Sequence, residues 1–155
     1  MNNNDIIRRI RYTFNLNDQH MIQLFESAGS TVDRVQIINW LKKDEDEEQE
    51  KLQDEDLAYF LNGFIIEKRG KKEGPQPVAE KQLNNNIILR KLKIALDLRD
   101  DDLIEIFSLA DMRISKHELS AFFRRPGQKH YRECKDQFLR NFLYGMQKKY
   151  RDNKE

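Results

Sequence analysis

An internal repeat constrains the fold of this chain more than any other feature of its sequence. Residues 84–151 align on residues 2–69 without a gap, and roughly a quarter of the aligned pairs are identical. The Asn triplet at 84–86 falls on the triplet at 2–4, and Gly145 falls on Gly63. A period of this length is typical of a duplicated structural unit. We therefore expect two copies of one fold, residues 1–70 and 84–155, joined by a Gly/Pro-containing linker at residues 71–83.

Apolar residues at helical spacing predict four helices in each copy. In the first copy, these helices are expected from Asn3 or Asn4 as the cap to Phe14, from Asp18 toward Gly29, from Asp33 to about Lys43, and over Asp54–Arg69. The same plan repeats in the second copy, where the last helix is expected over about Arg132–Tyr150. No stretch alternates as a strand would. The predicted fold class is all-α, with two tandem, pseudo-symmetric four-helix repeats that contain helix-turn-helix-like helix pairs.

Several residues inside these helices carry more specific expectations. Ser115 and Glu118 have capping-box spacing at the start of the second copy's third helix. Gly63 and Gly145 lie inside the fourth helices, where glycine costs about 1 kcal/mol relative to alanine, so we expect each to permit close approach of another helix. The apolar side of the first copy's third helix is expected to comprise Val35, Ile37, Ile38, Trp40 and Leu41.

Charge is distributed unevenly between the copies. Residues 1–70 carry 9 Lys/Arg and 14 Asp/Glu, a net charge of −5, whereas residues 71–155 carry 19 and 13, a net charge of +6. The two values sum to the +1 of the whole chain, which by itself points to neither nucleic acid nor membrane. The asymmetry is consistent with a basic binding face or with two halves that attract each other, and the sequence leaves both open.

The sequence indicates neither secretion nor membrane insertion. The N-terminus lacks the basic and apolar regions of a signal peptide, and no apolar run approaches the ~18 residues of a membrane span. We expect a cytoplasmic protein that does not enter a membrane, and the sequence does not fix its oligomeric state.

No motif in the sequence predicts catalysis, a cofactor or a metal site. The single cysteine, Cys134, aligns with Leu52 and is expected to be a small core residue. His20, His117 and His130 lack metal-ligand spacing, and the acidic run at 100–102 fits a helix N-terminus. Phosphate loops and nucleophile elbows are absent from the sequence. We therefore expect no catalytic residues, no cofactor and no metal, and a protein that is not an enzyme.

The second and third helices of each copy have spacing similar to a DNA-binding helix-turn-helix, although the turn is about two residues too long. Their polar side chains are the candidate nucleic-acid contacts, because Lys and Arg bind phosphates and polar groups read base edges. The candidates are Arg34, Lys42, Lys43, Lys116, His117, Ser120, Arg124 and Arg125. The alternative is that these are ordinary solvated faces of a helical bundle. The acidic run at 44–50 counts against the first copy.

The chain resembles the YehS-like family of small bacterial proteins, which are built from two copies of a domain of unknown function. The resemblance is carried by the segments at 3–12 (NNDIIRRIRY), 85–92 (NNIILRKL) and 114–124 (ISKHELSAFFR), and it covers nearly the whole chain. It implies a bacterial cytoplasmic protein and two tandem helical domains, and it transfers no catalytic residues.

These observations favour a non-enzymatic helical binding protein. Nucleic acid is the first partner to consider, bound through the third helices in a DNA-binding or regulatory role. The alternative is a protein–protein adaptor that uses either a groove between the copies or an apolar strip on the last helix around Tyr144 and Tyr150.

Overall fold

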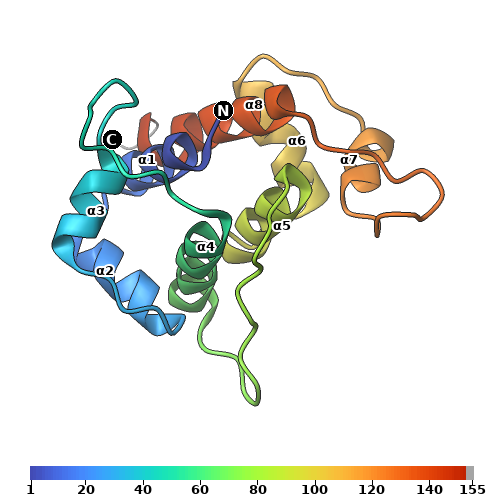
Figure 1. Cartoon of the computed structure of the whole chain (residues 1–155). Helices are drawn as coiled ribbons and strands as arrows, with labels where there is room; N and C mark the ends of the chain where they lie inside the picture. The colour runs from blue at the N-terminus through green and yellow to red at the C-terminus, as the bar shows by residue number, and fades with distance from the viewer. Residues whose placement is uncertain (153–155) are drawn as a thin grey trace. The chain divides into compact units, whose positions relative to one another are not determined.

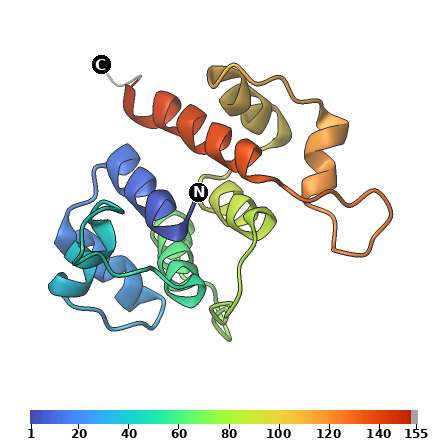
Figure 2. The ribbon, with the colours of Figure 1, turned by 45° about the horizontal axis from the view of Figure 1, so that its top comes forward.

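The computed structural model describes residues 1–152, and all regular secondary structure in this range is helical (Figure 1). One compact unit comprises Met1–Leu83, and a second begins at Asn84. The first unit contains α1 (Asn3–Phe14), α2 (Asp18–Ser27), α3 (Arg34–Leu41) and α4 (Asp54–Arg69). The second contains α5 (Asn85–Ala95), α6 (Asp100–Leu109), α7 (Lys116–Phe122), α8 (Asp136–Gln147) and a π-helical turn, η1 (Lys148–Asp152), that continues α8 (Figure 2). The predicted all-α fold with two four-helix repeats is confirmed.

In the first unit, α2 packs against both α3 and α4, and α1 also contacts α3 and α4. The centre of the core is aromatic: the ring of Phe25 lies 5.4 Å from that of Trp40 and 5.6 Å from that of Phe60. The second unit repeats this packing with α6, α7 and α8. There the rings of Phe107 and Phe142 lie 5.7 Å apart, at the positions that match Phe25 and Phe60.

Gly63 and Gly145 allow the backbones of two helices to touch. A Cβ atom on Gly63 would lie 1.8 Å from the carbonyl oxygen of Leu24 in α2. A Cβ atom on Gly145 would lie 1.9 Å from the carbonyl oxygen of Ile106 in α6. Neither space can hold a methyl group, so the close approach expected at both glycines is confirmed.

The Asn triplet at the start of each unit holds distant segments together. Asn2, rather than the expected Asn3 or Asn4, caps α1 by accepting a hydrogen bond from the backbone N–H of Asp5 at 2.8 Å. Asn3 is occupied elsewhere, because its Nδ2 donates to Asp54 at 2.7 Å. In the second unit, Asn84 caps α5 in the same way.

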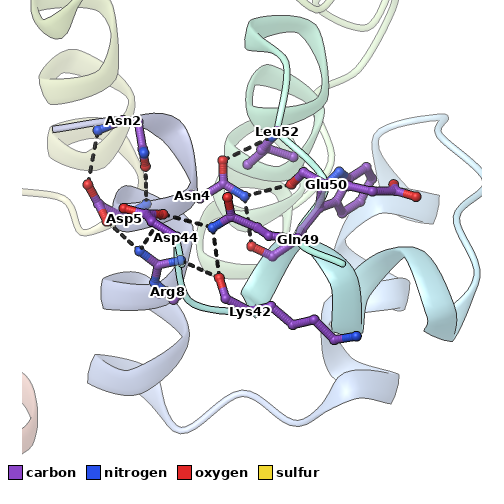
Figure 3. Close-up of polar contacts among 10 residues, drawn as sticks. Asn2, Asn4, Asp5, Arg8, Lys42, Asp44, Gln49, Glu50 and Leu52 are labelled. Atoms are coloured by element: carbon purple, nitrogen blue, oxygen red, sulfur yellow. Dashed lines mark hydrogen bonds and ion pairs between the residues drawn. The ribbon is translucent and has the colours of Figure 1, made fainter. Parts of the chain in front are cut away.

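The third residue of the triplet, Asn4, is buried and ties α1 to the segment that follows α3 (Figure 3). Its Nδ2 donates to the carbonyl oxygens of Trp40 and Glu50, both at 2.8 Å, and its Oδ1 accepts from the N–H of Leu52 at 3.0 Å.

Asn86 reproduces these three bonds in the second unit with Phe122, Arg132 and Cys134. The distances are 2.9 Å throughout. Since each partner lies at the matching position of the repeat, Asn4 and Asn86 fix the returning segment of both units in one geometry.

Two expected helix boundaries are wrong, and the returning segments explain one of them. α8 begins at Asp136, not Arg132, because the carbonyl oxygen of Arg132 accepts from Nδ2 of Asn86 at 2.9 Å instead of from a helical N–H, and Lys135 has extended backbone angles. α3 ends at Leu41, since Lys42 has extended backbone angles.

The expected apolar side of α3 is also partly wrong. Ile37 and Trp40 are buried, but Val35 is 64% exposed and Ile38 is 40% exposed. The cause is that α3 is short and packs through one side only, so residues on its other side remain in solvent.

Candidate nucleic-acid interface

The candidate site in the second unit is built on α7. Ser115 and Glu118 form the expected capping box: the Ser115 hydroxyl accepts from the N–H of Glu118 at 3.1 Å, and the Glu118 carboxylate accepts from the N–H of Ser115 at 3.3 Å. Hydrogen bonds from the Ser115 backbone and hydroxyl, and then the nearby Arg132 guanidinium, lower the pKa of Glu118. Leu119 and Phe122 are fully buried, so these two side chains fix which side of α7 faces the core.

The opposite side of α7 carries polar side chains toward solvent. Lys116 is 66% exposed, and its Nζ lies 3.3 Å from the carboxylate of Asp101. His117 is exposed, and Ser120 is half-buried with its hydroxyl donating to the backbone oxygen of His117 at 3.0 Å. Such an exposed ion pair is weak, so the Lys116 ammonium remains able to exchange its partner for a phosphate.

The segment after α7, residues 123–135, adds cations beside this helix. It extends away from the helices of its unit in both views (Figures 1 and 2). The Arg124 guanidinium donates to the backbone oxygen of Lys129 at 3.2 Å, and Arg125 is exposed. The loop returns to α7, because the ring of His130 lies 6.4 Å from that of His117.

The Arg132 guanidinium lies 3.4 Å from the Glu118 carboxylate, which ties the end of the loop to α7. The α7 face comprises Lys116, His117, Ser120, Arg124, Arg125, Lys129, His130 and Arg132. Residues 116–135 carry six Lys/Arg against two Asp/Glu, a net charge of +4.

The matching residues of the first unit are in a different electrostatic setting. Arg34 lies 3.3 Å from Asp18, Lys42 lies 2.6 Å from Glu48, and Lys43 is exposed. The hydrogen bond to Glu48 raises the pKa of Lys42. Residues 34–53 carry four Lys/Arg against six Asp/Glu, a net charge of −2. The candidates of the first unit therefore lie in an acidic setting and those of the second in a basic one.

The α2–α3 and α6–α7 pairs are both in contact, and both are joined by six-residue turns, 28–33 and 110–115. Five of the predicted site residues, Lys116, His117, Ser120, Arg124 and Arg125, lie on or directly after α7. Sequence reasoning missed the loop residues Lys129, His130 and Arg132. The available signal was the concentration of basic residues between Arg124 and Lys135.

Three other places are candidate sites: the thiol of Cys134, a hollow at the α6–α7 turn, and the last helix. Cys134 is buried, and desolvation raises its pKa to about 12, which keeps the thiol neutral. A hollow of about 380 Å³ lies at the α6–α7 turn, lined by Ile104, Ser108 and the segment 111–114. At the end of the last helix, the ammonium of Lys148 in η1 lies over the exposed ring of Tyr144 in α8, 5.0 Å from its centroid, and Tyr150 in η1 is half-buried. The expected apolar strip on the last helix is thus partly covered.

Within residues 1–152, no group of His, Cys, Asp and Glu side chains is arranged to hold a metal ion. Among the helices of this range, none combines the length and the apolar character needed to cross a bilayer.

Comparison with known proteins gives a family and no biochemical function. A family model described as "Protein of unknown function (DUF1456)" matches the chain twice, over residues 3–70 and 85–152. The chain is 41% identical over 147 residues to the "Uncharacterized protein YehS" of Escherichia coli (strain K12), covering 94% of each protein. No solved structure gives a significant match. The resemblance to the YehS-like family is confirmed.

Proposed function

The chain belongs to the DUF1456 family of proteins of unknown function, and we propose that it binds nucleic acid through the α7 face of its second unit. The observation that carries this proposal is the gathering of cations around one exposed helix. Lys116 and Arg125 project from α7 and the start of the loop, and Lys129 lies further along the same loop. Phosphate groups are the natural partners of such a cluster, because each bound cation releases condensed counterions from the nucleic acid.

The polar residues of α7 supply groups that can approach bases. His117 and Ser120 lie one helical turn apart on the exposed side, between Lys116 and the arginines. Imidazole and hydroxyl groups donate and accept hydrogen bonds, as base edges require. We therefore assign phosphate binding to Lys116, Arg125 and Lys129, and base contact to His117 and Ser120.

The proposal is confined to the second unit and to binding. In the first unit, the acidic run at 44–50 would repel a phosphate backbone, and Lys42 already lies 2.6 Å from the carboxylate of Glu48 within that run. Cys134, the one cysteine in the sequence, is buried and its pKa is raised to about 12, so its thiol is not a candidate nucleophile.

A titration of a labelled random-sequence DNA duplex, followed by fluorescence anisotropy at two salt concentrations, tests this function. Binding should weaken steeply as salt rises. Replacing both Lys116 and Arg125 by alanine should weaken binding about tenfold or more and reduce the salt slope by about two, because two phosphate contacts are lost. Arg124 is left intact, because its guanidinium holds the loop.

The matched control is Arg34→Ala with Lys43→Ala, which removes two cations at or near the equivalent positions of the first unit. This variant should bind as the unaltered protein does. Absence of binding at low salt, or an equal loss in both variants, would rule out the α7 face as the site.

A further inference from the structure

The outer side of α3 differs from the outer side of α7 although the two helices occupy equivalent places. Val35 and Ile38 lie three residues apart, on one side of α3, with 64% and 40% of their surfaces exposed. Their counterparts in the second unit are the polar residues His117 and Ser120. At this position the first unit therefore presents an apolar pair to solvent, whereas the second presents a polar pair.

Carboxylates are held at the C-terminal end of the helix that carries this apolar pair. The segment 44–50 follows α3 and returns to it, because the N–H of Glu50 donates to the backbone oxygen of Asn39 at 3.1 Å. Gln49 fixes the segment internally by donating from Nε2 to the oxygen of Lys42 and to the carboxylate of Asp44, both at 2.8 Å (Figure 3). The acidic loop is therefore anchored to the last turn of α3.

Much of the loop's charge is not neutralised. Asp44 is 3.5 Å from Arg8, and Glu48 is paired with Lys42. The hydrogen bond from Gln49 lowers the pKa of Asp44, so this carboxylate stays charged at neutral pH. Glu45 and Glu47 are exposed and form no salt bridge with any residue between 1 and 152. The α3 face, defined as Val35, Ile38 and the loop 44–50, thus combines an apolar pair with free negative charge.

We propose that the α3 face docks a cationic amphipathic helix of a partner protein. Apolar side chains of that helix would cover Val35 and Ile38, and its Lys or Arg residues would pair with Glu45 and Glu47. Amphipathic helices bind in this way, with apolar anchors on one side and charges at the rim. This surface is separate from the nucleic-acid site on α7 and does not depend on it.

Charge distinguishes this partner from a second copy of the chain. Two α3 faces packed against each other would bring together two acidic loops, each with six Asp/Glu between residues 44 and 50. The α7 face of another copy has suitable charge, but it presents His117 and Ser120 where apolar groups are needed. A basic helix with its own apolar stripe satisfies both requirements.

The test uses a fluorescein-labelled synthetic helix of roughly four turns, with leucine on one side and lysine on the other. The unaltered protein should bind it, whereas a peptide with glutamate in place of lysine should not bind. Val35→Ser with Ile38→Ser should weaken binding about tenfold or more, because the apolar anchors are lost. Glu45→Gln with Glu47→Gln should weaken it less and reduce its dependence on salt.

His117→Ala with Ser120→Ala, at the matching positions of the second unit, is the control and should leave peptide binding unchanged. Circular dichroism should show equal helix content in all variants, since the altered side chains are exposed or partly exposed. Unchanged peptide affinity in the Val35/Ile38 variant would overturn the proposal. Concentration-dependent dimerisation that this variant abolishes would also overturn it, by assigning the face to a second copy.

Discussion

The two third helices, α3 and α7, occupy the same place in two copies of one fold, yet they present opposite surfaces. α3 carries an exposed apolar pair and is followed by an acidic loop, whereas α7 carries polar side chains and is followed by a basic loop. In both copies the loop is attached by the same three hydrogen bonds, from Asn4 or Asn86. The comparison indicates that the repeat preserves a framework while its outer surface has diverged in polarity and charge.

The largest effect on stability is expected at the glycines of α4 and α8, which the two units share. Gly63→Ala and Gly145→Ala should each reduce the free energy of unfolding by about 3 kcal/mol, because the added methyl group meets a carbonyl oxygen. In an unconstrained helix the same change would stabilise by about 1 kcal/mol.

Chemical denaturation measures the free energy of unfolding of both glycine variants. The fluorescence of Trp40 reports on the first unit and circular dichroism on both. Gln137→Ala, an exposed change on α8, is the control and should alter stability by less than about 0.5 kcal/mol. A stabilised alanine variant in either unit would contradict the shared close helix contact.

The second prediction concerns the buried asparagines. Asn4→Ala and Asn86→Ala should each lower the free energy of unfolding by about 2 kcal/mol, since two backbone carbonyls and one N–H lose their buried partner. The effect should be similar in the two units and should be measured by urea unfolding.

Gln23→Ala on the exposed side of α2 is the comparison variant for the asparagines. If Asn86→Ala left the free energy of unfolding unchanged while Asn4→Ala lowered it, the framework would not be equivalent in the two copies.

A smaller effect should distinguish the units at one core position. Cys134 occupies the place that Leu52 fills in the first unit, and burial raises its pKa from 9.0 to about 12. The folded state favours the neutral thiol. The contribution of this group to the free energy of unfolding is therefore complete below pH 9 and declines as pH rises toward 12. At pH 10 the second unit should have lost about 1 kcal/mol relative to pH 7.

Cys134→Ala should remove this part of the alkaline dependence, even though the variant is less stable at pH 7. Unfolding curves of both proteins at several pH values between 7 and 10 give the comparison. Identical pH slopes for the two proteins would show that the thiol does not titrate with the predicted shift.

Much of the framework follows from local sequence signals. The repeat and the capping box at Ser115 predict the helices, because each signal acts within a helix or recurs in both copies. The two helix glycines predict the close helix contact that both units share. The exposure of Val35 and Ile38 could not be predicted in this way. An apolar residue at helical spacing does not show whether a second helix covers it, and α3 is covered on one side only.

The candidate site was predictable on α7 but not along its loop. Lys116, His117 and Ser120 follow from the capping box and helical spacing. The position of His130 and Arg132 depends on Asn86, which lies 46 residues before its partner Arg132. No local periodicity reports a hydrogen bond over such a separation. The same long-range bond explains why the expected start of α8 at Arg132 was wrong.

The most direct test of the divergent surfaces is a residue-resolved titration of the intact protein with duplex DNA. Amide resonances in ¹H–¹⁵N correlation spectra should shift or broaden within Lys116–Arg132, while those of Arg34–Glu50 should remain in place. Spectral changes of equal size in both segments, or changes only in the first unit, would contradict the account in which one framework carries two different binding faces.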